Sequence, residues 1–126
     1  MFNGIIFNNG KVKKILVTNK GKSLFIFSKL PLTKKNIGMS IACDGVCLTL
    51  VSVKKGILEF YLLNETINRS KFKYLKVGDS INLELPLKYG QDISGHICQG
   101  HIDTTSKIVN ISKKGSSRVL EFEVNK

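Results

Sequence analysis

Proline, histidine, cysteine and long apolar runs are all scarce in this chain of 126 residues. Only two prolines interrupt it and 42% of its residues are hydrophobic, so it can bury a core and lacks the composition of a disordered chain. No apolar run approaches the roughly 20 residues that a membrane helix requires, so no membrane association is expected. The length suits one compact domain, with an appendage at most.

The cysteines do not form a disulfide framework. Cys43, Cys47 and Cys98 are an odd number without the regular spacing of disulfide-rich domains. The N-terminus is not typical of a secretory signal, because its apolar residues precede its basic ones. A cytoplasmic location, where thiols stay reduced, is therefore expected.

Acidic residues and arginines are also few. Twenty basic residues against nine acidic ones give a net charge of +11, but all the basic residues except Arg69 and Arg118 are lysines, spread along the whole chain. Surfaces that read nucleic acids rely on arginine, often beside exposed aromatic residues, whereas scattered lysines are typical of a solvated surface. A nucleic-acid partner is therefore not favoured. A basic β-barrel that binds RNA or DNA stays open as an alternative, and its affinity would fall steeply with salt.

The pattern that is abundant is alternation of apolar and polar residues with period two. In Ser80–Leu85 every second residue is apolar, which predicts a half-buried strand. Further strands are predicted at Lys11–Val17, Lys22–Ser28, Val46–Val53, Ile57–Leu63, Ile97–Asp103, Ser106–Ile111 and Arg118–Val124. Turns are predicted at Asn8–Gly10, Asn19–Gly21, Asp44–Gly45, Lys54–Gly56 and Lys113–Gly115. Short strands joined by short turns favour an all-β sandwich or closed barrel, with one helix at Asn68–Leu75.

A faint internal repeat divides the chain. The stretch "GIIFNNGKVKKI" from Gly4 can be aligned with "HIDTTSKIVNI" from His101. The repeat predicts a complete unit at residues 1–93 and the beginning of a second at 94–126, because a pair would need about 190 residues. Strands after Ile97 would then lack partners, so we expect them to join the first unit's edge, swap between subunits or be poorly ordered.

Both histidines lie in "SGHICQGHID", Ser94–Asp103. On an extended strand His96 and Cys98 point to one face, while His101 and Asp103 point to the other. One tetrahedral zinc ion would need ligands from both sides of a sheet, so no metal site is expected here. Histidines that merely form hydrogen bonds on a strand are the plain alternative.

Two other stretches offer polar groups for a ligand. Cys47 and Thr49 share a face beyond the predicted turn, where they would line a pocket for a polar heterocycle, unless Cys47 is a small core residue. Glu65 and Thr66 end a predicted strand and would bind a polyol, unless Thr66 caps the helix from Asn68. With two histidines, a base that titrates near neutral pH is one of them, a shifted carboxylate or a thiol.

Taken together, five stretches resemble a known family. "MFNGII", "DGVCLTL", "NET", "LKVGDSINLE" and "SGHICQGHID" occur in the order and spacing of the N-terminal half of riboflavin synthase, the α-type enzyme. The resemblance runs along nearly the whole chain. It implies a six-stranded Greek-key β-barrel followed by an incomplete second barrel, and a homotrimer whose active sites lie between barrels of neighbouring subunits.

The resemblance also implies an activity. Two molecules of 6,7-dimethyl-8-ribityllumazine exchange a four-carbon unit and yield riboflavin and 5-amino-6-(ribitylamino)uracil, without a metal or redox cofactor. Small-molecule substrate and product, with further copies of the chain, are the implied partners. A non-catalytic lumazine- or flavin-binding barrel of the same family is the alternative.

By position, the resemblance implies two groups of ligand-binding residues. One pocket would contain Phe2, Asn3, Gly4, Ile5, Ile6, Cys47, Leu48, Thr49, Leu62, Leu63, Asn64, Glu65 and Thr66, with Ser40 as a further polar group. Gly100, His101 and Ile102 would begin the matching pocket of the second barrel. The implied catalytic residues are His101, Cys47 and Ser40. Asn3 stands where the family usually has threonine, and Asp44 where asparagine is common.

Overall fold

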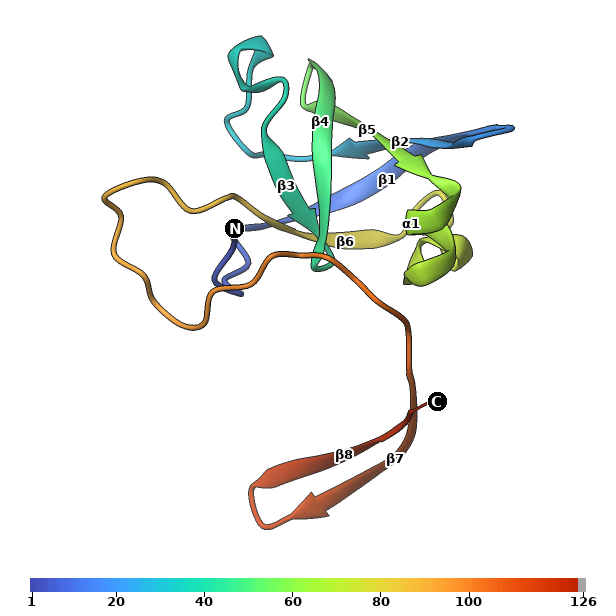
Figure 1. Ribbon diagram of the computed structural model, residues 1–126, viewed down its shortest axis with the longest axis vertical. Helices are drawn as coiled ribbons and strands as arrows, with labels where there is room; N and C mark the ends of the chain where they lie inside the picture. The colour runs from blue at the N-terminus through green and yellow to red at the C-terminus, as the bar shows by residue number, and fades with distance from the viewer. Residues whose placement is uncertain (125–126) are drawn as a thin grey trace.

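Six antiparallel strands form a closed barrel in the computed structural model, which describes residues 1–124. Their spatial order is β1-β2-β5-β4-β3-β6, and β6 pairs with β1 to close the barrel (Figure 1). The strands are β1 (Asn8–Thr18), β2 (Gly21–Phe27), β3 (Ser40–Cys43), β4 (Val46–Lys54), β5 (Ile57–Leu63) and β6 (Ser80–Glu84). The predicted all-β fold with one six-stranded Greek-key barrel is confirmed.

Alternate residues of the strands fill the barrel. Leu24 and Ile26 of β2, with Phe60 of β5, are almost completely buried, because period-two alternation turns one face of each strand inward. The core cluster also contains Val12, Ile41, Cys43, Val46, Leu48, Leu50, Leu58, Leu62, Ile67, Phe72, Ile81 and Leu83. The intervening residues of the same strands face outward, where they are available to line a binding site.

The first strand begins earlier than the turn prediction allows. Asn8–Gly10 belongs to β1 and pairs with β6, where Gly10 lies opposite Ile81. Gly10 suits this strand because a Cβ there would collide with the side chain of Ile26. The turn prediction for Asn8–Gly10 was therefore wrong, since "NNG" is also compatible with a strand against which a neighbour packs closely.

The helical segment differs from the expected Asn68–Leu75. An α-helix, α1 (Asn64–Arg69), follows β5 directly, and a 3-10 helix, η2 (Lys71–Tyr74), follows α1. Ser70 separates them and caps η2, since its hydroxyl accepts a hydrogen bond from the Phe72 amide at 3.3 Å. Thr66 lies inside α1 and is not a helix cap. Another 3-10 turn, η1 (Lys34–Asn36), lies before β3.

The predicted strand Ile97–Asp103 is not a strand. It forms a single bridge to the N-terminus, in which the amides and carbonyls of Phe2 and Cys98 exchange two hydrogen bonds of 2.8 Å. A closed barrel has no free edge on which a seventh strand could pair. The segment instead runs over the outside of the barrel.

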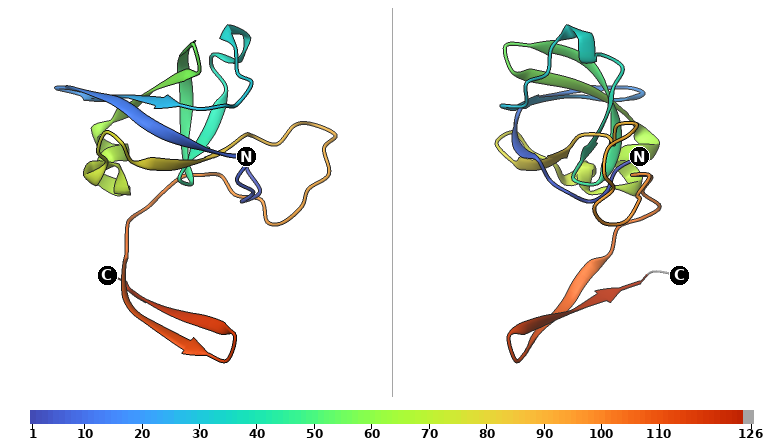
Figure 2. Two further views of the ribbon diagram at one scale, coloured as in Figure 1. Left: turned by 180° about the vertical axis from the view of Figure 1, so that it is seen from behind. Right: turned by 90° about the vertical axis from the view of Figure 1, so that its left-hand side faces the viewer.

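The last two strands, β7 (Lys107–Lys114) and β8 (Ser117–Glu123), pair only with each other among the described residues. Figures 1 and 2 show this hairpin standing away from the barrel. Its residues are exposed throughout. The expected addition to the barrel edge is wrong, because closure leaves no edge. Residues 125–126 of the expected second unit lie outside the described residues.

The hairpin repeats the pairing of β1 with β2. The β1–β2 register shifts between Val12 and Lys14, and the β7–β8 register shifts between Ile108 and Asn110, 96 positions later. Residue pairs on both sides of the shift keep the same offset in both strands. A bulge at the same place supports an internal repeat, at an offset of 96 positions where the alignment of Gly4 with His101 gave 97.

Candidate functional site

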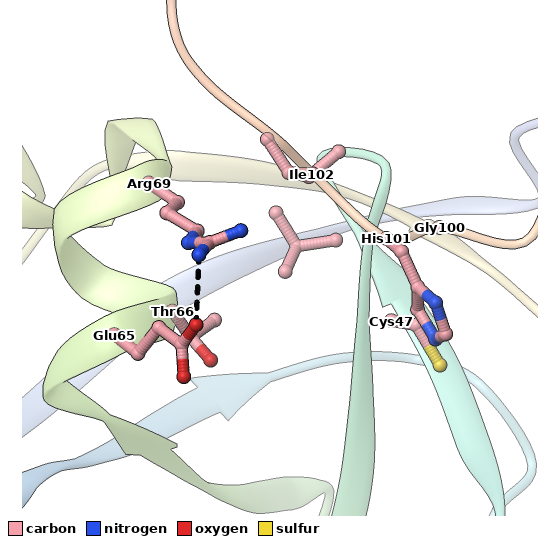
Figure 3. A pocket seen from close by; sticks show the side chains of 8 residues that line it. Cys47, Glu65, Thr66, Arg69, Gly100, His101 and Ile102 are labelled. Carbon is pink, nitrogen blue, oxygen red and sulfur yellow. Dashed lines mark ion pairs between the residues drawn. The ribbon is translucent and has the colours of Figure 1, made fainter.

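A cleft of about 330 Å³ opens on the outside of the barrel, between α1 and residues 100–102. Figure 3 shows Glu65, Thr66 and Arg69 on one side of it, and Cys47, Gly100 and His101 on the other. Val46 and Ile102 complete the lining. The lining therefore combines apolar side chains, a thiol, an imidazole, a hydroxyl and two charges of opposite sign.

The β3–β4 turn builds the first wall. Asp44 and Gly45 have positive φ angles of 49° and 84°, as a two-residue hairpin turn requires, so Cys47 faces outward. Its amide donates a hydrogen bond to the Gly100 carbonyl at 2.8 Å. Gly100 also has a positive φ of 80°, and a Cβ there would lie 2.9 Å from Cys47 Cβ. The wall thus depends on glycine at position 100.

Helix α1 builds the second wall. Glu65 and Arg69 are one turn apart and form an ion pair with an N–O distance of 3.0 Å. Both side chains are more than half exposed, so the pair adds little stability and its charges stay accessible to a ligand. Ile67 anchors α1 in the core, and the Ser70 hydroxyl donates to the Thr66 carbonyl at 2.6 Å.

The N-terminal segment is fixed by a buried carboxylate. Glu84 Oε1 accepts hydrogen bonds from the amides of Asn3 and Gly4 at 2.8 Å each, and from that of Ile5 at 3.3 Å. Asn3 adds a local bond, since its Oδ1 accepts from the Ile5 amide at 3.3 Å. Phe2 is buried, and its bridge to Cys98 joins the N-terminus to residues 98–102, the strip that lines one side of the cleft.

The cleft brings together six residues singled out from the sequence, which are Cys47, Glu65, Thr66, Gly100, His101 and Ile102. The resemblance implied a separate pocket for residues 100–102, whereas in the structure they line the same cleft as Cys47. Gly4, Ile5 and Ile6 are exposed and do not line this cleft. The amides of Gly4 and Ile5 already donate to Glu84, which leaves their carbonyls for other partners.

The other predicted residues lie around the cleft or behind it. Ser40 and Thr49 are directly opposite each other in the β3–β4 pair, on the same outer face as Cys47. Leu48 and Leu62 point into the core. Leu63 is exposed, and Asn64 holds the β1–β2 turn by donating its side-chain amide to the Asn19 carbonyl at 3.2 Å.

Sequence reasoning missed Val46, Arg69 and Glu84. Arg69 would have been found from its four-residue spacing to Glu65 if the helix had been predicted to begin at Asn64. Glu84 was placed correctly on the outward face of its strand. Nothing in the sequence marks it as buried, because the amides that cover it lie about 80 residues earlier.

The three thiols have different surroundings. Cys43 faces the core, and burial, reinforced by Asp44 and Cys47, raises the pKa of its thiol, which keeps it neutral and unreactive. Cys47 is half-buried in the cleft, and Cys98 is exposed. Within residues 1–124 no three His, Cys, Asp or Glu side chains gather as a metal site would require. In the same range no helix is long and apolar enough to span a membrane.

The strand order defines a Greek-key β-barrel, with a cleft on its outer face. Residues 3–86 match the lumazine binding domain family, and the chain belongs to this family. It is 36% identical to riboflavin synthase of Buchnera aphidicola subsp. Schizaphis graminum and 32% identical to that of Escherichia coli, each over 98% of this chain. The chain spans 60% and 59% of these relatives' lengths.

Solved structures show the same fold. The structure of LumP with 6,7-dimethyl-8-(1'-D-ribityl) lumazine superimposes with a TM-score of 0.79, at 24% sequence identity, and covers the whole chain and 70% of LumP. LumP in complex with flavin mononucleotide superimposes with a TM-score of 0.78. At this identity the likeness shows the fold alone, and the ligands belong to LumP.

Proposed function

We propose that this chain is the lumazine-binding portion of a riboflavin synthase. It would bind 6,7-dimethyl-8-ribityllumazine and take part in the dismutation of two such molecules to riboflavin and 5-amino-6-(ribitylamino)uracil. The observation that carries the proposal is that Cys47, Glu65, Thr66 and Gly100–Ile102 line one cleft. Its volume of about 330 Å³ is in the range of small-molecule sites.

The chemistry of the lining suggests how the ligand lies. The planar ring would rest between Val46 and Ile102, with the Cys47 thiol and the His101 imidazole at its edge. The ribityl chain would follow α1, where the Thr66 hydroxyl and the Glu65 carboxylate accept hydrogen bonds from its hydroxyl groups. Ser40 and Thr49 extend this polar surface along the outer face of β3 and β4.

Catalysis would come mainly from holding two lumazines in register. The 7-methyl group of the lumazine is acidic because its carbanion is delocalised into the ring. The protein therefore has to orient the second molecule, an effect worth roughly 7–11 kcal/mol in well-ordered pairs. His101 is the proposed acid–base group in the cleft, and Cys47 and Ser40 are polar groups that would assist at the acceptor ring.

The second lumazine needs a second pocket, which we assign to a second barrel that begins at residues 94–126. Phe2 and Cys98, which form the antiparallel bridge, are 96 positions apart, the same offset as between the two hairpins. Gly4 and Gly100 have the same φ of 80°. This internal symmetry suggests that residues 4–6 serve the second pocket as residues 100–102 serve the first, in a trimer that brings pockets of neighbouring subunits together.

Titration with 6,7-dimethyl-8-ribityllumazine, followed by fluorescence, tests binding, and an assay of the same mixture for riboflavin tests turnover. We expect saturable binding that Glu65→Gln weakens, because a neutral amide is a poorer acceptor for the ribityl hydroxyls. Glu121→Gln is the control, since Glu121 is also an exposed glutamate and lies on the distant hairpin. His101→Gln should slow riboflavin formation more than it weakens binding.

The outcomes separate the possibilities. Binding with riboflavin formation supports a complete site assembled between subunits. Binding without product supports the second candidate function, a lumazine- or flavin-carrying barrel, which is favoured by LumP structures with lumazine, riboflavin and flavin mononucleotide. Absence of binding contradicts both. The unpaired thiols suit a cytoplasmic location for either function.

A further inference from the structure

We propose that Glu84 is a positioning residue for the cleft, which it never touches. In this proposal its carboxylate fixes the N-terminal segment, and that segment holds residues 98–102 in the place where they form the cleft wall. The effect on the ligand rests on the proposed function, whereas the effect on the two segments stands on the geometry alone.

Glu84 is a buried charge that only backbone amides neutralise. It is 4% exposed and forms no ion pair with any residue in 1–124. Its Oε1 instead accepts three hydrogen bonds, from Asn3, Gly4 and Ile5. An uncompensated buried carboxylate is costly, so the segment and the charge hold each other in place.

Two backbone links carry this restraint to the cleft. Next to Asn3, Phe2 exchanges two hydrogen bonds of 2.8 Å with Cys98. Two residues farther along, the Gly100 carbonyl accepts from the Cys47 amide, also at 2.8 Å. The strip from Cys98 to Gly100 is therefore fastened at both ends, and His101 follows directly.

The strand register places the same residues in one row. Ala42 of β3 lies opposite Glu84 of β6 on one side and opposite Cys47 of β4 on the other. The carboxylate and the thiol are thus two strands apart on the same outer face, about 10 Å at the usual strand spacing. The N-terminal segment contacts one end of this row at Glu84 and Gly100 contacts the other at Cys47, and Ala42 between them is only 2% exposed.

The test compares Glu84→Ala, which removes the acceptor, with Glu84→Gln, which keeps an acceptor oxygen without the charge. Amide exchange of Phe2, Cys98 and Cys47 is followed by NMR in the full chain, and lumazine affinity by fluorescence. We expect exchange at Cys98 and Cys47 to accelerate at least roughly tenfold in Glu84→Ala, which loses all three hydrogen bonds to the N-terminal segment, and less in Glu84→Gln, which keeps an acceptor. The Kd should rise by about fivefold or more.

Glu59→Ala is the matched control. Glu59 lies on β5 and accepts a hydrogen bond from the Ser52 hydroxyl at 2.7 Å, away from the cleft. It should lower the melting temperature without changing exchange at Cys98 or the Kd. A merely structural role for Glu84 would give the same pattern as Glu59→Ala.

Each result decides the proposal. Unchanged exchange at Cys98 and Cys47 in both Glu84 variants would overturn it, as would faster exchange with an unaltered Kd. If Glu84→Ala does not fold, Glu84→Gln decides alone on the same criteria. If the wild-type chain binds no lumazine, the proposed function fails, and the exchange measurement still shows whether Glu84 holds the strip.

Discussion

At the scale of single residues, the cleft depends on how closely two backbones approach. Gly100 lies against Cys47 and Gly45, and its carbonyl accepts a hydrogen bond from the Cys47 amide. Among residues 1–124 this is the one backbone hydrogen bond between the 98–102 strip and β4. Only glycine combines a positive φ with so little space. A larger residue at position 100 would displace the backbone of the strip and so alter the cleft, although no functional group of the cleft would be removed.

Gly100→Ala should therefore damage binding more than stability. The added methyl group must push the strip away from Cys47, which breaks a hydrogen bond worth about 1 kcal/mol and moves His101. We expect lumazine affinity to fall roughly fivefold or more in a fluorescence titration. Gly115→Ala is the control, because it has a positive φ of 63° but no neighbour within 4 Å. Equal affinities in the two variants would contradict the role of this contact.

Cys43 gives a prediction about pH. Because burial raises the pKa of its thiol above the ordinary 9.0, the folded protein keeps the proton while the unfolded chain releases it. The stability that the neutral thiol contributes is complete below pH 9 and declines as the pH rises above it. Urea unfolding at pH 8, 9 and 10 should show a steeper alkaline loss for wild type than for Cys43→Ala. Parallel losses would mean that other groups dominate.

At the scale of elements, period-two alternation predicted most of the barrel strands, because their inward faces are apolar and their turns contain glycine. It failed for Ile97–Asp103, since a strand also needs a partner edge and a closed barrel offers none. Six of the residues that line the candidate cleft were named from the sequence, but Val46 and Arg69 were not, and residues 100–102 were assigned to a separate pocket. Sequence spacing alone does not show that residues 100–102 fold back onto the first barrel.

The β3–β4 turn is tied to the helical segment by one side chain. Asp44 Oδ1 accepts from the Asn82 amide at 2.8 Å, and its Oδ2 lies 2.8 Å from Lys71 Nζ of η2. Asp44, which stands where the family commonly has asparagine, therefore forms an ion pair with Lys71. The Lys71 side chain is 56% exposed and the Asp44 side chain 8%. This link joins the element before Cys47 to the one after α1.

Substitutions at this link should separate its two bonds. Asp44→Ala loses the Asn82 hydrogen bond and disfavours the positive φ of 49°, at a cost of about 2 kcal/mol in unfolding free energy. Asp44→Asn removes the charge together with the ion pair and should cost less than about 1 kcal/mol. Lys71→Met leaves the buried Asp44 Oδ2 without a partner and should cost more than Asp44→Asn. Urea denaturation measures all three. A cost for Asp44→Asn equal to that for Asp44→Ala would show that the ion pair dominates.

At the scale of the whole molecule, the cleft extends beyond the boundary that the sequence predicts for the first unit. The barrel strands end at Glu84, but the barrel's cleft is complete only with Ile102. No residue of the β7–β8 hairpin lines the cleft. The sequence predicts a boundary near residue 93, whereas a boundary near residue 104 would enclose every residue that lines the cleft.

Two truncations test this division. A chain ending at residue 104 should keep lumazine binding within about twofold of the full chain, because every lining residue is present. A chain ending at residue 95 should still fold but bind at least roughly tenfold more weakly, having lost the strip that carries His101. Circular dichroism and fluorescence titration compare the two. Similar affinities for both would place the ligand elsewhere on the barrel.

The cleft's dependence on a strip that follows the barrel has a consequence for synthesis on the ribosome. In the barrel, β1 pairs with β6, so the barrel cannot close before Glu84 has left the exit tunnel. Ile102, the last residue that lines the cleft, comes 18 residues later. At about 5–20 residues per second this interval lasts roughly 1–4 s. During it the newly closed barrel exposes Cys47, and the cleft can form only when the following segment emerges.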